Sequence, residues 1–194
     1  TSGQSRQFSA SEQQLAEFVA VVLADTEDTW DVLFKSLGET YQDPKLVLFT
    51  GRVQSACGAA QAAMGPFYCP GDQRVYLDTG FFQVMEQQLQ AGGEFANAYV
   101  IAHEVAHHVQ NLLGTLSQVN TQRSRASETE SNALSVRLEL QADCYAGIWA
   151  RAASERARCI RCRPEQDTTA SRLAILAAPV GRCVCVWGGW GSAH

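Results

Sequence analysis

Residues 94–113 have the sequence EFANAYVIAHEVAHHVQNLL, and this segment decides the fold. Gly92 and Gly93 precede it and Gly114 follows it, while no Gly or Pro lies between, so the sequence predicts one helix with a start and a stop signal. Apolar residues cover most of the circumference of this helix. A helix of this kind is buried on nearly all sides, and we therefore expect it at the centre of the domain.

The predicted central helix carries the pattern His-Glu-x-x-His at His103, Glu104 and His107. At 100° per residue the two histidines lie about 40° apart and one turn along the helix, so both imidazoles can meet one ion. The composition of the chain gives roughly 0.005 chance occurrences of this pattern. Buried polar groups are also costly unless they bind metal or are paired. The pattern predicts a zinc site in which Glu104 is the general base toward a zinc-activated water.

A catalytic zinc site needs a third protein ligand and an open position for water. The metzincin continuation of the pattern would place Gly at position 110 and His at position 113. The chain has Gln110 and Leu113 there, which excludes that class. His108 points about 100° away from His107 and should miss the same ion.

Two acids on the next predicted helix offer the remaining ligand. Glu139 and Asp143 lie four residues apart on one face of a helix that is otherwise apolar. We interpret Glu139 as the third zinc ligand and Asp143 as the acceptor of a hydrogen bond from a ligand histidine. Two alternatives stay open. The acids could be a solvated pair at a helix edge, and Glu128 or Glu130 could be the ligand, although their polar neighbours favour a solvent-facing loop.

Outside these two helices, the apolar patterns predict a mainly helical protein with a small sheet. The strand at 74–77 is a candidate edge along which a peptide could align by main-chain hydrogen bonds. The expected elements are a helix with Ser11 as its N-cap, a separate helix at 28–37, a buried strand at 45–50, a hairpin of 67–69 with 74–77, a helix at 81–89, a polar loop or loose helix start at 117–131 and a long helix from 132 to about 153.

The length and charge of the chain limit its class. A chain of 194 residues suits one domain, and a net charge of −5 gives no footprint of a nucleic-acid partner. No apolar run reaches the roughly 18–20 residues that span a bilayer. The composition predicts a polar linker at 1–10, a core at 11–154 that carries the predicted zinc site, and a divergent tail rich in Arg, Cys and Gly at 155–194.

The chain has seven cysteines, and two of them enclose a short loop that leads into the predicted hairpin. In an oxidising compartment we expect a disulfide between Cys57 and Cys69, which would contribute about 3 kcal/mol through loop closure. Four others stand in the tail and could hold a second, structural zinc ion, although their spacing is not the usual one. These four are Cys159, Cys162, Cys183 and Cys185.

Four segments make a resemblance to a known family specific: VLADTEDTW, SACGAAQAAMGPFYCPGDQRVYLD, FANAYVIAHEVAHHVQNLLG and ELQADCYAGIWA. From about Phe18 to Ala153 the chain resembles the bacterial family of "putative neutral zinc metallopeptidases". The resemblance implies a zincin-like α+β fold, in which a small sheet packs over the active-site helix. It also implies an N-terminal membrane anchor, not in this chain, and a catalytic domain on the extracytoplasmic side of the bacterial cell envelope. Residues 155–194 depart from the helical sequence of the family.

The sequence and the resemblance together predict a zinc-dependent metallopeptidase with one catalytic Zn²⁺ and a peptide or protein substrate. The alternative is a zinc-binding but proteolytically inactive cell-envelope interaction protein. The divergent tail keeps this alternative open, because the missing family sequence could supply the group that stabilises the oxyanion. Tyr76, Tyr99 and Tyr145 are candidates for that group within the core.

Overall fold

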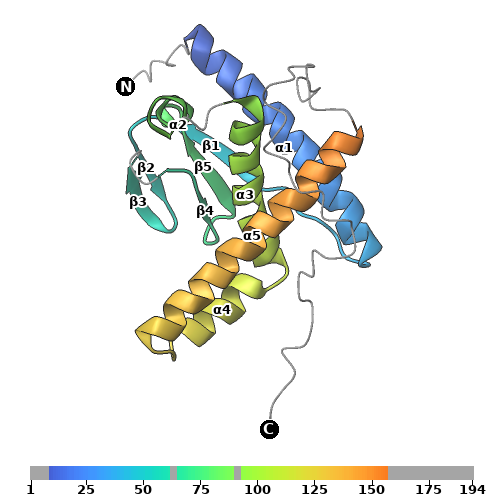
Figure 1. Cartoon of the computed structure of the whole chain (residues 1–194), viewed down its shortest axis with the longest axis vertical. Helices are drawn as coiled ribbons and strands as arrows, with labels where there is room; N and C mark the ends of the chain where they lie inside the picture. The colour runs from blue at the N-terminus through green and yellow to red at the C-terminus, as the bar shows by residue number, and fades with distance from the viewer. Residues whose placement is uncertain (1–8, 62–64, 90–92, 157–194) are drawn as a thin grey trace, which may run out of the picture.

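The structure is a computed structural model that describes residues 9–61, 65–89 and 93–156 (Figure 1). It is an α+β protein, mainly helical with a small sheet, as the sequence predicts. The elements in chain order are α1 (Ala10–Ser36), β1 (Lys45–Phe49), β2 (Arg52–Ser55), β3 (Gly58–Gln61), β4 (Phe67–Cys69), β5 (Arg74–Asp78), α2 (Phe81–Leu89), α3 (Glu94–Leu112), α4 (Thr115–Arg123) and α5 (Glu128–Arg156).

Helix α3 is the central element, which confirms the prediction from its apolar circumference. Figure 1 shows it in the middle of the molecule, with the sheet on one side, α1 on the other and α5 crossing it. The side chains of Ile101, Val105 and Val109 are at most 1% exposed, so α3 forms the wall between the main apolar clusters. The helix ends before Gly114, whose φ of 76° is a backbone conformation that favours glycine.

Helix α1 is one continuous helix, whereas the sequence predicts two helices with Ser11 as the first N-cap. The N-cap is Ser9, whose hydroxyl accepts a hydrogen bond from the backbone N–H of Glu12 while the Glu12 carboxylate accepts one from the backbone of Ser9. Near the expected break, Thr26 and Thr29 are almost fully buried and donate their hydroxyls to backbone carbonyls of the same helix. Tertiary packing therefore outweighs the weak helix propensity of this segment.

The three-stranded sheet has the order β1-β5-β4. Strand β5 pairs parallel with β1 and antiparallel with β4, which confirms a strand at β1 and the predicted hairpin of β4 and β5. The prediction that the first of these strands is buried is wrong for most of its length, because β1 lies at an edge of the sheet and only Phe49 is buried. The prediction that residues 74–77 form an edge is wrong, because β5 is the central strand and β4 lies at the edge. The sequence also missed the β2–β3 hairpin, since β3 has only Gly, Ala and Gln and lacks the branched side chains typical of strands.

Of the two alternatives for the polar segment after α3, a loop or a loose helix start, the structure has mostly helix: α4 ends at Arg123 and α5 begins at Glu128. Leu116 and Val119 of α4 are buried against Leu138 of α5, and this small apolar contact holds a helix that its polar composition does not indicate. At the start of α5, Ser127 and Glu130 exchange hydrogen bonds in the pattern of a capping box. The Glu130 carboxylate therefore caps the N-terminus of α5, in the exposed first turn of that helix.

Helix α5 continues to Arg156, whose guanidinium donates hydrogen bonds to the buried carboxylate of Asp25 on α1 at 2.9 and 3.2 Å. Arg156 stands two residues beyond the predicted core boundary at 154, so the core extends at least to this residue. The rest of the predicted tail, with the four cysteines proposed as a second zinc site, lies outside the described residues, as do residues 1–8 of the predicted linker. Among the helices in the described ranges, none combines the length and the apolarity needed to cross a bilayer.

Candidate metal centre

His103, His107 and Glu139 converge on one point between α3 and α5. The Oε2 atom of Glu139 lies 3.2 Å from Nε2 of His103 and 3.3 Å from Nε2 of His107. The candidate ligand atoms of these three residues all lie within 4.8 Å of one another. The two histidines are one turn apart on the same face of α3, which places both imidazoles opposite a single residue of α5.

The partner of His103 determines which of its nitrogens can bind metal. Nδ1 of His103 lies 2.9 Å from the Oδ1 atom of Asp143, one turn beyond Glu139 on α5. Nε2 of the same ring faces the carboxylate of Glu139 at 3.2 Å, so a metal ion decides the tautomer: with the ion on Nε2, Nδ1 carries the proton and donates it to Asp143. The lone pair is then on Nε2, the atom that faces Glu139. The structure thus brings Asp143 into contact with His103, and its role beside a zinc ligand stays a prediction.

The orientation of His107 depends on Gln110, the residue that stands where metzincins have Gly. Gln110 is fully buried, and its Nε2 donates hydrogen bonds to the carbonyl of Leu138 at 2.8 Å and to the Gln141 side chain at 3.0 Å. This fixes the amide, since a backbone carbonyl only accepts, and leaves Oε1 of Gln110 facing Nδ1 of His107 at 2.9 Å. Nδ1 of His107 is therefore the protonated atom, and its Nε2 also presents a lone pair.

Two imidazole lone pairs and a carboxylate oxygen thus point at the same small volume. A positive charge at this point, either a metal ion or a proton on an imidazole, offsets the repulsion between these electron-rich atoms. Neutral imidazole nitrogens together with one carboxylate oxygen are ligands that zinc takes in catalytic sites, and each ligand histidine donates its other N–H to an acceptor, as is usual around protein-bound zinc. The residues present therefore fit a zinc ion.

Glu104 is beside this group and does not belong to it. Its side chain is only 8% exposed. Burial raises the pKa of the Glu104 carboxyl, while the neighbouring His107 and His103 and a hydrogen bond from the backbone of Tyr68 act in the opposite direction. A carboxylate with a raised pKa accepts a proton more readily, which suits a general base.

The group opens into a cleft of about 370 Å³. Helix α3 contributes His103, Glu104 and His107 to the lining, and α5 contributes Glu139. Edge strand β4 and the residues beside it form another wall, and α4 a further one. Their lining residues are Pro66, Phe67, Tyr68 and Pro70 on the strand side and Leu116, Asn120 and Arg123 on α4.

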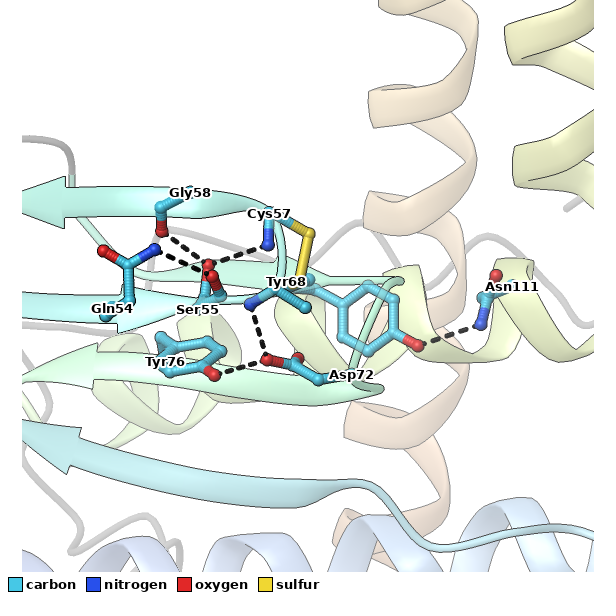
Figure 2. Close-up of a disulfide and its surroundings, with 10 residues drawn as sticks. Gln54, Ser55, Cys57, Gly58, Tyr68, Asp72, Tyr76 and Asn111 are labelled. Carbon is cyan, nitrogen blue, oxygen red and sulfur yellow. Dashed lines mark hydrogen bonds between the residues drawn. A yellow bond between two sulfur atoms is a disulfide. The ribbon is translucent and has the colours of Figure 1, made fainter.

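His108 lies on the other side of α3 and contacts none of the three candidate ligands. It is fully buried, with Nε2 donating to the carbonyl of Gln42 at 2.6 Å and Nδ1 lying 3.0 Å from the hydroxyl of Tyr68. Because Nε2 must donate to a carbonyl, Nδ1 accepts from Tyr68 in the neutral ring, and burial lowers the pKa of His108. Asn111 donates to the same Tyr68 oxygen at 3.1 Å (Figure 2).

The predicted disulfide between Cys57 and Cys69 is present and anchors this strand. Figure 2 shows the bridge joining the β2–β3 turn to the end of β4, next to Tyr68, whose ring reaches toward Asn111 of α3. Cys69 is fully buried. The covalent link and the Tyr68 hydroxyl therefore fix the edge strand from two directions.

None of the three tyrosines considered for the oxyanion lines the cleft. The hydroxyl of Tyr76 donates to Asp72, and that of Tyr99 donates to the backbone carbonyl of Asp143. Tyr145 is buried with its ring against Trp30. Glu128 and Glu130, the rival ligands, are also outside the group of converging atoms.

This fold and this site define a class: an α+β protein of zincin-like architecture, whose central helix offers a metal site to an open cleft. The chain belongs to the family described as "Putative neutral zinc metallopeptidase", which matches residues 1–172. The match extends beyond both ends of the segment from Phe18 to Ala153 that carries the resemblance in sequence.

Two bacterial relatives illustrate how far the similarity reaches. The uncharacterized protein YpfJ of Escherichia coli K12 is 53% identical over 144 residues, which are 74% of this chain and 50% of that protein. The uncharacterized protein Rv2575 of Mycobacterium tuberculosis H37Rv is 46% identical over 138 residues, 71% of this chain and 45% of that protein. The chain thus spans about half the length of the curated relatives it matches. No solved structure matches it significantly.

Proposed function

We propose that this chain is a zinc-dependent metallopeptidase that hydrolyses peptide bonds, with Glu104 as general base. The observation that carries the proposal is the position of the Glu104 carboxylate beside the three candidate metal ligands. The ligand atoms of His103, His107 and Glu139 converge on one point, and the buried carboxylate of Glu104 lines the same open cleft without joining them. A proton acceptor beside a metal, rather than on it, is what peptide hydrolysis by a zinc site requires.

When bound, zinc would supply Lewis-acid chemistry: it polarises a carbonyl and brings the pKa of water to about 7. The residues of the chain supply the rest. Glu104 accepts the proton of the attacking water and returns it to the leaving amine. Asp143 and Gln110 hold the two imidazoles in the tautomer that binds metal.

Edge strand β4 is where the substrate would align. It pairs with β5 on one side only within the described part of the chain, and Phe67 and Tyr68 line the cleft. An extended peptide can add to such an edge through main-chain hydrogen bonds. The backbone of Tyr68 also reaches Glu104, so a peptide on this edge would lie beside the base.

The cellular site is part of the same proposal. We place the protein on the extracytoplasmic side of the bacterial cell envelope, with a membrane anchor in a longer form of the chain. The Cys57–Cys69 disulfide supports this placement, because disulfides persist in oxidising compartments.

The first test is hydrolysis of quenched peptides by the full chain with and without a chelator. We expect hydrolysis that the chelator abolishes and added zinc restores. Glu104→Gln, which keeps the volume of the side chain, should lower the rate by roughly 10²–10⁴-fold and leave the zinc content near one ion per chain. Loss of zinc in that variant would contradict the role of base. A chain that binds zinc and cleaves no peptide would support the alternative, an inactive interaction protein of the envelope.

A further inference from the structure

The wall of the cleft formed by α4 carries a positive charge beside the metal group. Arg123, in the last turn of α4, is the only arginine or lysine among the described residues that line the cleft, and Asn120 precedes it by one turn on the same face. The acids in the lining have other partners. Glu139 faces the two histidines, and Glu104, a buried residue of α3, accepts a hydrogen bond from the backbone of Tyr68.

The exposed side chain of Arg123 makes one hydrogen bond and is not neutralised by an acid among the described residues. Its Nε donates a hydrogen bond to the Ser131 hydroxyl of α5 at 3.2 Å. Within the described ranges no carboxylate forms an ion pair with it, whereas Arg151 and Arg156 each pair with an acid. Ser131 occupies one edge of the guanidinium, so the two terminal nitrogens are left for a ligand. A planar fork of N–H donors matches a carboxylate in two parallel hydrogen bonds.

We propose that Arg123 binds a carboxylate of the peptide substrate, and that the protein prefers substrates with an acidic group at one fixed position from the scissile bond. This inference rests on the proposed function and names its substrate class. A peptide aligned on β4 would lie in the cleft that Arg123 also lines. The carboxylate belongs to an acidic side chain or to a free C-terminus, and both sources have the same chemistry at the guanidinium.

The experiment uses one peptide scaffold in which a single Glu or Gln is moved through each position. Every peptide is prepared with a free C-terminus and with an amide. We expect kcat/KM to be roughly 5- to 20-fold higher for the carboxylate at one position. The free-acid and amide pair separates the two sources. Arg123→Gln should bring this ratio close to one, and the matched variant Arg125→Gln, two residues along and outside the cleft lining, should keep the ratio of the original chain.

A binding measurement separates this inference from the proposed function. Fluorescence anisotropy of the same peptides on zinc-loaded Glu104→Gln should show the same preference, and the added Arg123→Gln change should remove it. If the original chain cleaves nothing, the proposed function fails, and the binding ratio still decides the role of Arg123. Equal binding of Glu and Gln peptides at every position would overturn the inference. So would an Arg123→Gln variant that weakens acidic and neutral peptides by the same factor.

Discussion

Helix α3 presents polar side chains on two sides, and they have opposite surroundings. We call the face with His103, His107 and Gln110 the metal side, and the face with His108 and Asn111 the sheet side. On the metal side, each histidine has one nitrogen held by a partner on α3 or α5 and the other directed at Glu139. On the sheet side, both nitrogens of His108 have protein partners.

The difference shows what makes a histidine a metal ligand. His107 and His108 are neighbours in the sequence, and both are largely buried in the same helix. A ring whose two nitrogens are satisfied by a carbonyl and a hydroxyl has no lone pair to give, and it contributes to stability instead. A ring with one satisfied nitrogen can bind metal. Substitutions on the metal side should therefore change zinc binding, and those on the sheet side should change the free energy of unfolding.

The largest effect is expected for Glu139, the residue on which both imidazoles of the metal side converge. Glu139→Ala should release zinc almost completely, because two neutral imidazoles remain without a charged ligand. Asp143→Ala should weaken zinc only about 10- to 100-fold, since Asp143 acts through His103. Zinc affinities measured by competition with a chelator would give this order, and the reverse order would exchange the two roles.

The disulfide secures strand β4 next to Tyr68, which contacts His108 and Asn111 on the sheet side of α3, so its removal tests that side indirectly. The double variant Cys57→Ala, Cys69→Ala opens a loop whose ends are 12 residues apart, and we expect the free energy of unfolding to fall by about 3 kcal/mol. The zinc content should stay near one ion per chain. Denaturant unfolding with zinc present, followed by metal analysis of the native protein, measures both. A variant that keeps its stability but loses zinc would show that the two sides are not separable.

Much of this fold could be predicted from the sequence because its strongest signals are local. The central helix has apolar residues around its circumference and glycines at both ends, and the β4–β5 hairpin has a Pro-Gly turn between strand-forming residues. The errors and the open alternatives arise where contacts between distant segments decide. Helix α4 has a polar sequence and is held by Leu116 and Val119 against α5, and α1 continues through buried threonines.

The candidate site follows the same division. The spacing of His103, Glu104 and His107 was sufficient to place them together, because four residues make one helical turn. Helix α3 packs against α5, which is distant in sequence, and no local pattern predicts that contact. The only sequence signal for Glu139 as a ligand was therefore an acid on an otherwise apolar helix. The sequence analysis did not predict the role of Gln110. An amide on an apolar helix, three residues after His107, was the available signal, because a buried amide needs hydrogen-bond partners.

Gln110→Met tests whether that amide acts on the metal side. Methionine has a similar volume, so the main loss is the acceptor for Nδ1 of His107 and the two hydrogen bonds to α5. Because His107 can then rotate or change its tautomer, we expect zinc affinity to fall about 10-fold, at the lower end of what such supporting residues contribute. The pH dependence of zinc binding should change as well. Zinc affinity equal to that of the original chain would remove Gln110 from the metal side.

The smallest effect is expected for Asn111, which follows Gln110 in the sequence and has its amide on the sheet side. Asn111→Ala removes one hydrogen bond to the oxygen of Tyr68, which still donates its proton to His108. No fully buried group loses its only partner, so the free energy of unfolding should fall by about 1 kcal/mol. Zinc affinity should be unchanged within about twofold, because the metal side keeps all its contacts. Titration with zinc and denaturant unfolding of the Gln110 and Asn111 variants together make the sharpest comparison. Gln110→Met should lower mainly the zinc affinity, and Asn111→Ala should lower only the free energy of unfolding. A fall in zinc affinity for Asn111→Ala would show that the sheet side also positions the metal ligands.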